Sequence, residues 1–287
     1  MPCYYFDPSL IALWETIRGF LNSSFMSASL SALAGAGLGV WGAQKLAERS
    51  SSRKELIDAL RQANAIVVLA ATIANHALRV KKQNIAPLTA QFFKDRAIAE
   101  VVNSRLLQGL PPAGPINYQA NLVKITPVTV PIDSLKQLIY ATHTTPGRAL
   151  AIAVEAEQAV TELTHAINTR TEQVELFKNA QMPEELLWQA YFGLKRRDGN
   201  TDSLYHDSMV AIAQYTDDLA FFCAELATEL QQHATRLYEK IVKFSPDHPK
   251  PSTVDFSGPI KSGLMPDRAN YESWLSGFTS PDKKGAA

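Results

Sequence analysis

The sequence predicts an all-α protein in which a single N-terminal transmembrane helix precedes an elongated cytoplasmic helical bundle with a long antiparallel helical hairpin. Two observations carry this prediction: an uncharged, proline-free stretch near the N-terminus, and long segments with apolar residues at three- and four-residue spacing. The expected regions are an amphipathic segment at 1–24, the transmembrane helix at 25–45, the bundle at 46–243 with a Pro-rich insertion at about 110–146, and a Pro/Ser/Gly-rich tail at 244–287.

The composition agrees with one membrane anchor on an otherwise soluble chain. Charged residues make up 20% of the 287 residues, which is too many for a protein made mostly of membrane spans. The formal net charge is zero, so no global electrostatic attraction favours nucleic acid, and we expect no nucleic-acid partner. Cys3 and Cys223 are the only cysteines, so no disulfide framework is expected.

The first residues lack the basic start of a signal peptide. The segment Leu10–Leu21 places apolar residues at helical spacing opposite Glu15 and Arg18. This short amphipathic helix either lies in the membrane interface or packs against the folded domain.

The transmembrane prediction rests on Phe25–Ala43, which contains no charged residue and no proline. A helix of this length spans about 28 Å, close to the ~30 Å hydrocarbon thickness of a bilayer. Trp41 and Lys45 are the expected interfacial anchors. Five cations follow the span and only Arg18 precedes it, so the positive-inside rule predicts a single-pass inner-membrane protein with most of the chain in the cytoplasm. These cations are Lys45, Arg49, Arg53, Lys54 and Arg61.

Every fourth residue of the span is small, which predicts close helix–helix contact in lipid and therefore a homo-oligomer. This small-residue ridge consists of Ser27, Ser31, Gly35, Gly39 and Ala43. The alternative is that a Gly/Ala-rich helix packs inside a soluble bundle.

The helical pattern continues after the span without proline or glycine from Gln44 until Pro87. Between Asn64 and Asn75 lie ten uncharged, mostly apolar residues, too few to span a membrane, so a buried core helix is expected. A cationic patch follows at Arg79, Lys81 and Lys82. It is either a solvated helix end or a surface that faces phosphate groups.

The stretches GAGLGVWGAQKLAER (35–49) and QANAIVVLAATIANHALRVKKQNI (62–85) resemble a group of uncharacterised bacterial proteins with one N-terminal span and an Asn-bracketed helix. The resemblance covers about the first 90 residues and contains no catalytic signature. It implies a shared anchor and adjoining helix, and by analogy a role in envelope stress or defence against phage.

The Pro-rich insertion at about 110–146 contains Pro127 and Pro131, which exclude a central strand and leave an extended or edge conformation. It is either a connector or a protruding element that contacts a partner.

Two long helices are expected to form the antiparallel hairpin, with near-heptad, coiled-coil-like spacing. The first begins near Pro146 and Arg170 interrupts its apolar seam; the second begins after Asp202 as N-cap. The expected seam residues are Ala156, Val160, Leu163, Ile167, Val174 and Phe177, facing Ile212, Tyr215, Leu219, Phe222, Leu226, His233 and Leu237.

No catalytic motif was recognised, and no cofactor is expected. The one alternative is a di-iron-like, metal-binding helical-bundle enzyme, suggested by a Glu-x-x-His unit and a second Glu/His pair. Its ligands would be Glu162, His165, Glu229 and His233. The favoured function is a membrane-anchored scaffold or sensor without enzymatic activity, which contacts lipid through its span and a protein partner through its bundle or its tail.

Overall fold

The computed structural model describes residues 15, 18–19, 24–111, 120–141, 147–179, 181 and 183–278, and the side chains of residues 24–40 are not part of the description. The chain divides into two compact units, Met1–Asp58 and Ala59–Ala287. The regular structure of the described residues is helical, which confirms the all-α prediction. The described part contains a single isolated β-bridge, between Lys195 and Thr201.

The described elements follow one another in this order: α2 (Ser24–Val80), η1 (Lys81–Ile85), α3 (Ala86–Leu107), α4 (Ile132–Tyr140), α5 (Gly147–Asn179), α6 (Glu184–Phe192), α7 (Leu204–Ile241), α8 (Ser257–Lys261), η2 (Arg268–Tyr271) and α9 (Glu272–Ser276).

The first unit contributes the beginning of α2. From residue 41 to residue 55 every side chain of this helix is exposed. Hydrogen bonds one helical turn apart support it, from Gln44 Nε2 to Glu48 Oε1 (3.1 Å) and from Ser51 Oγ to Glu55 Oε1 (3.0 Å). This part of α2 is therefore stabilised by local contacts along its own surface.

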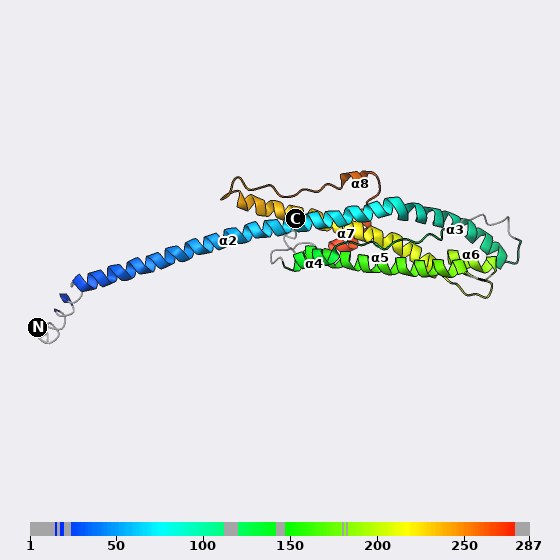
Figure 1. Cartoon of the computed structure of the whole chain (residues 1–287), viewed down its shortest axis with the longest axis horizontal. Coiled ribbons are helices and arrows are strands. Elements are labelled where there is room, and N and C mark those ends of the chain that lie inside the picture. The colour runs from blue at the N-terminus through cyan, green and yellow to red at the C-terminus, as the bar shows by residue number, and fades with distance from the viewer. Residues whose placement is uncertain are drawn as a thin grey trace, which may run out of the picture. The chain divides into compact units, whose positions relative to one another are not determined.

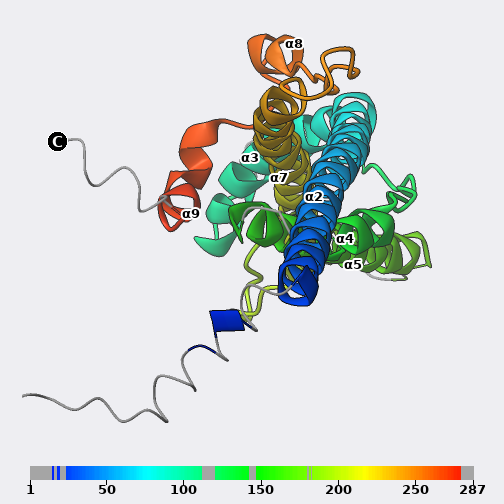
Figure 2. The ribbon, with the colours of Figure 1, turned by 90° about the vertical axis from the view of Figure 1, so that its left-hand side faces the viewer.

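In the second unit, α5 and α7 pack against each other in antiparallel directions (Figure 1). Arg148 near the start of α5 contacts Glu229 near the end of α7, with 3.1 Å between Arg148 Nε and Glu229 Oε2. Further along, Arg170 Nε lies 3.3 Å from Met209 Sδ near the start of α7. The end-on view in Figure 2 shows α4 beside α5 and α8 over α7.

The apolar segment after Asn64 forms a buried core helix, as predicted. Ile66, Val67 and Ile73 are almost fully buried. They belong to one hydrophobic cluster that also contains Leu163 of α5 and Leu226 of α7. Burial of this kind is the main source of stability for long helices of low intrinsic propensity.

A second, aromatic cluster closes the end of the unit where α3, α6 and the start of α7 meet. The rings of Tyr191 and Tyr205 are stacked with 4.5 Å between their centroids, and Phe92 contacts Tyr191 edge-on at 5.6 Å. The aromatic residues of α6 thus cap the core.

Pro87 does not end the helix, contrary to the expected break at this residue. The chain passes from α2 into α3 through the π-helical turn η1, in which the N–H of Ala86 donates to the carbonyl of Lys81. A proline ring in a regular α-helix clashes with the carbonyl four residues earlier, here that of Gln83. The wider π-turn accommodates this ring and keeps the helix continuous.

Two further details differ from the sequence prediction. The short helix α4 lies within the region expected to be only a Pro-rich insertion, and its buried Leu135 and Ile139 pack on α5. The N-cap of α7 is Ser203 and not Asp202. Asp202 instead faces Arg196, with 3.8 Å between the carboxylate and the guanidinium.

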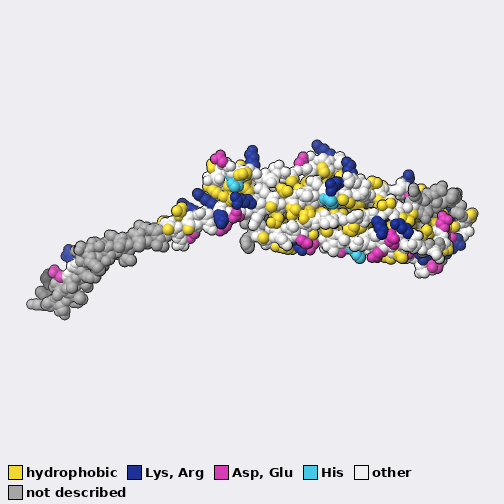
Figure 3. Space-filling model, in the orientation of Figure 1, with side chains coloured by type: hydrophobic (Ala, Val, Ile, Leu, Met, Phe, Trp, Pro, Cys, Tyr) yellow, Lys and Arg dark blue, Asp and Glu magenta, His cyan; other side chains and the backbone are white. Residues whose placement is uncertain are grey.

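The C-terminal segment packs on the helical core instead of forming a core of its own. The ring of Tyr271 stacks on Phe221 with 3.8 Å between centroids, and its hydroxyl donates to Asp218 Oδ1 (2.7 Å). Trp274 contacts Phe222 and donates from Nε1 to Glu155 Oε1 (3.1 Å). Figure 3 shows charged side chains of both signs scattered over the drawn face, in agreement with the zero net charge.

Gly193 and Gly199 provide a matched test of the turn between α6 and α7. Both have positive φ, 65° and 86°, but a Cβ at Gly193 would lie 2.8 Å from Cβ of His206, whereas one at Gly199 would meet nothing within 4 Å. We expect Gly199→Ala to lower the free energy of unfolding by about 1 kcal/mol through backbone strain alone. Gly193→Ala should cost clearly more, because strain and overlap add. Chemical denaturation of both variants measures the difference, and equal losses would contradict the described packing.

Candidate functional site

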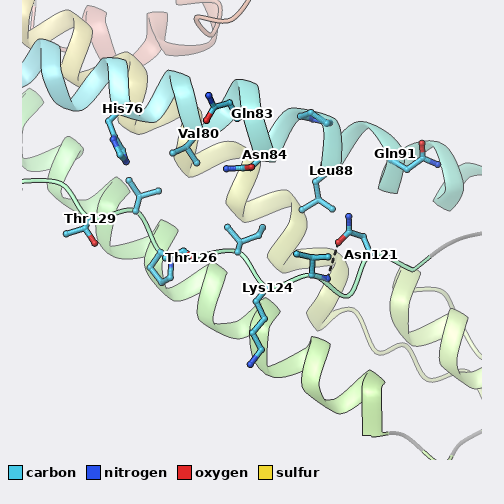
Figure 4. Close-up of a pocket in the computed structure, with 15 residues that line it drawn as sticks. His76, Val80, Gln83, Asn84, Leu88, Gln91, Asn121, Lys124, Thr126 and Thr129 are labelled. Carbon is cyan, nitrogen blue, oxygen red and sulfur yellow. Dashed lines mark hydrogen bonds between the residues drawn. The ribbon is translucent and has the colours of Figure 1, made fainter.

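The strongest candidate site is a groove of about 770 Å³ between the α2–η1–α3 helix and the extended segment 120–131, and we call it the amide groove. Figure 4 shows the two walls: helical side chains above, and the extended trace running below them. The helical wall carries His76, Val80, Gln83, Asn84, Leu88 and Gln91, and the extended wall carries Asn121 and the residues from Val123 to Thr129.

The π-turn forms part of the helical wall. Gln83 and Asn84 lie inside η1 and both are exposed. Because Pro87 has no N–H, it cannot donate to a carbonyl of the preceding turn. The turn therefore places the amide side chains of Gln83 and Asn84 at the groove.

Arg170 holds the extended wall in place. This side chain of α5 is fully buried. Its Nη1 donates to the carbonyl of Val123 (2.8 Å) and its Nη2 to the carbonyl of Asn121 (2.9 Å). The Tyr205 hydroxyl donates to the same Asn121 carbonyl (3.1 Å), and the guanidinium lies 5.4 Å from the Tyr205 ring centroid. The residue expected to interrupt the apolar seam thus fixes a separate segment of the chain.

The lining of the amide groove holds few charges. Among the described residues that line it, Lys124 is the one Lys, Arg, Asp or Glu side chain, and its Nζ lies 3.2 Å from Glu175 Oε1. Beside the groove, Arg79 Nη2 lies 2.9 Å from His76 Nδ1, and Gln91 Nε2 donates to both carboxylate oxygens of Asp95 at 2.9 Å. The lining is therefore mainly polar and uncharged, which suits a neutral hydrogen-bonding ligand better than an ion.

A second cavity of about 840 Å³ lies between α7 and the C-terminal segment. Its charged groups bind one another: Lys81 Nζ lies 2.7 Å from Asp217 Oδ1 and donates to the Leu264 carbonyl (2.8 Å), and Arg268 pairs with Glu225. These intramolecular bonds use the polar groups that a ligand would need. We therefore interpret this cavity as a gap between two packed segments and not as a ligand-binding site.

The small-residue ridge lies in α2, but the side chains of Ser27, Ser31, Gly35 and Gly39 are outside the described residues. Ala43 is exposed.

Trp41 and Lys45, the expected interfacial anchors, contact each other. Trp41 is 60% exposed, and Lys45 Nζ lies 4.7 Å from its ring centroid. This cation–π contact places a positive charge and an indole together at the C-terminal end of the apolar stretch.

The structure divides the predicted cationic patch. Lys81 points to Asp217 of α7, Arg79 contacts His76, and Lys82 is exposed. Consecutive helical residues point about 100° apart, so Lys81 and Lys82 do not share a face. Arg79 and Lys82 stay exposed, whereas Lys81, paired with Asp217, does not join them in the phosphate-facing surface that was one of the two alternatives.

The alternative metal ligands are not brought together. Within the described part of the chain, no group of three or more His, Cys, Asp or Glu side chains is placed to hold a metal ion. Glu229 contacts Arg148, whereas Glu162 lies fourteen residues further along α5, about 21 Å at 1.5 Å per residue. His165 is exposed, and burial together with nearby cations lowers the pKa of His233. The antiparallel register thus separates the two Glu/His pairs.

Cys223 is fully buried, and burial raises its pKa to about 12. A thiol in this state stays protonated at neutral pH and is a poor nucleophile. Cys223 is therefore an inert residue of the core.

Comparison of the chain with protein-family models, curated proteins and solved structures finds no match. The candidate site is therefore argued from its geometry.

Replacement of Arg170 tests the support of the groove. We expect Arg170→Met to lower the free energy of unfolding by about 2–4 kcal/mol, because the carbonyls of Asn121 and Val123 lose the donors of a fully buried guanidinium. Arg170→Lys should lose part of this, since an ammonium cannot reproduce the fork of two N–H groups. The exposed Arg236→Met on the same pair of helices is the control. If chemical denaturation gave the same midpoint for all three variants, Arg170 would not hold the segment.

Proposed function

We propose that the chain is a membrane-anchored helical scaffold or sensor protein without enzymatic activity of its own. Its transmembrane segment Phe25–Ala43 would self-associate, and its second unit would bind a protein partner in the cytoplasm. The observation that carries the proposal is this uncharged helical segment, which ends at the exposed pair Trp41 and Lys45 and is followed by further cations.

One other part of the same helix also meets the composition of a span. Among the residues with described side chains, the helical stretch Trp41–Leu107 is long and apolar enough to cross a membrane, and 44% of its most apolar window is buried in the protein. A core helix passes the same test, and Ile66, Val67 and Ile73 pack in the core. We therefore place the span at Phe25–Ala43 and the apolar residues after Asn64 in the folded unit.

The exposed surface of residues 41–55 supports this placement. In this part of α2 the apolar side chains of Trp41 (60% exposed) and Leu46 (70% exposed) are not covered by any element among the described residues. Such residues suit the lipid headgroup region, where an indole and the aliphatic stem of a lysine are stabilised. The resemblance to bacterial anchored proteins extends the proposal to envelope stress or phage defence by analogy only.

The two natural cysteines test the orientation. Cys3 precedes the proposed span, and Cys223 is buried and protonated, so a membrane-impermeant maleimide should label intact spheroplasts at Cys3 alone. The Cys3→Ser variant should remain unlabelled. A Cys3→Ser/Ser273→Cys variant, which has an exposed thiol in the second unit, should label only after lysis. Labelling of Ser273→Cys in intact spheroplasts would reverse the proposed orientation.

Glycine substitutions test self-association. Leu at Gly35 and Gly39 would prevent close approach of two helices along the small-residue ridge, so the double variant should lose detergent-stable oligomers. Gly37→Leu adds the same side chain on another face of the helix and should leave them intact. Sedimentation or cross-linking in mild detergent measures the oligomer. Equal oligomer size in all variants would refute a role for the ridge.

A further inference from the structure

We infer that the amide groove binds an extended polypeptide segment of a partner protein by β-strand addition, with the segment 124–129 as the receiving edge. This inference deepens the proposed scaffold role, because it names the site and the kind of partner. It rests on the unpaired backbone of the extended wall and on the side chains that face it.

The extended wall is a chain segment outside any regular element of the described residues. The backbone groups of residues 124–126 and 128–129 have no hydrogen-bond partner within the described part of the chain. The segment is nevertheless anchored at both ends: Arg170 binds the carbonyls of Asn121 and Val123, and Val128 is buried in the main core. A strand held in place with free N–H and C=O groups is a template for another strand.

Backbone groups of alternate residues in an extended chain point to opposite edges. Because the carbonyls of Asn121 and Val123 point to Arg170, the inference assigns the backbone groups of Lys124 and Thr126 to the groove edge. Pro127 shares the phase of Asn121 and Val123. Its missing N–H therefore falls on the edge that faces α5 and leaves the groove edge with its donors.

The helical wall complements the second edge of a bound peptide. Gln83 and Asn84 are exposed in the π-turn, and neither side chain has a hydrogen-bond partner among the described residues (Figure 4). A primary amide offers both a donor and an acceptor, as a peptide group does. Val80 and Leu88 on the same wall provide apolar contact for alternate side chains.

The charge and size of the groove fit this occupant. Lys124 is the one Lys, Arg, Asp or Glu side chain among the described lining residues, and it is paired with Glu175, so the lining has no cluster of cations to select a phosphate or a carboxylate. Its volume of about 770 Å³ lies in the range of sites for small ligands and short peptides. A neutral peptide with apolar residues at alternate positions can form hydrogen bonds with the extended wall and with the amides of the helical wall, and apolar contacts with Val80 and Leu88.

The test uses the full chain in detergent and an array of random peptides of about eight residues, long enough to cover the receiving edge at ~3.3 Å per residue. A matched array contains the same peptides with alternate backbone nitrogens methylated, in both registers. We expect binding that favours apolar residues at alternate positions and weakens about tenfold when the edge-facing nitrogens are methylated. No bound peptide at ~1 mM, or equal binding to the methylated array, would overturn the inference.

Thr126 supplies the matched variants in the protein. Thr126→Pro removes the N–H at the centre of the receiving edge, and Thr126→Ala removes only the exposed side chain. Both should unfold at the wild-type temperature, since this N–H has no internal partner. Thr126→Pro should bind the retained peptides about tenfold more weakly, and Thr126→Ala as the wild type does. Equal affinity of both variants would exclude strand addition but would leave the oligomer and orientation results unaffected.

Discussion

The buried guanidinium of Arg170 is the interaction on which the arrangement of the second unit depends. A charge removed from water is stable only when other dipoles or charges replace its hydration. Here the carbonyls of Asn121 and Val123 do so, together with the ring of Tyr205. Those carbonyls belong to a segment without regular structure. Their hydrogen bonds to Arg170 therefore fix the position of this segment along α5. The extended wall of the amide groove follows from this constraint.

The opposite wall follows from a second local conflict. Pro87 stands where the apolar pattern of α2 and α3 favours an uninterrupted helix, and the π-turn η1 reconciles the two. The turn also changes which faces of the helix are buried: Ile85 still points into the core, while Gln83 and Asn84 remain exposed beside the groove. Arg170 and Pro87 thus each shape one wall of the amide groove, although they lie far apart in the sequence.

Helical periodicity identified the features that depend on short-range sequence. The faces of α5 and α7 and the buried helix after Asn64 could be predicted, because burial repeats with the helical turn. Arg170, the π-turn and α4 could not. The role of Arg170 depends on carbonyls almost fifty residues away, and α4 is short and lies among prolines. The separation of Glu162 from Glu229 likewise depends on the antiparallel register, which spacing within each helix does not specify.

The proposed attachment to a membrane lowers the affinity for a peptide that the amide groove would need. Strand addition over a few residues gives modest affinity, because each backbone hydrogen bond contributes only about 0.5–1.5 kcal/mol after exchange with water. In the proposed arrangement several copies share one patch of membrane, so a partner with repeated segments, or one anchored in the same bilayer, meets many grooves at high effective concentration. A groove that binds through backbone hydrogen bonds suits this arrangement. Weak backbone hydrogen bonds exchange rapidly, and they do not depend on cations that the anionic lipid surface would also attract. Under both proposals, self-association through the span and a weak peptide site in the folded unit would be complementary parts of one scaffold.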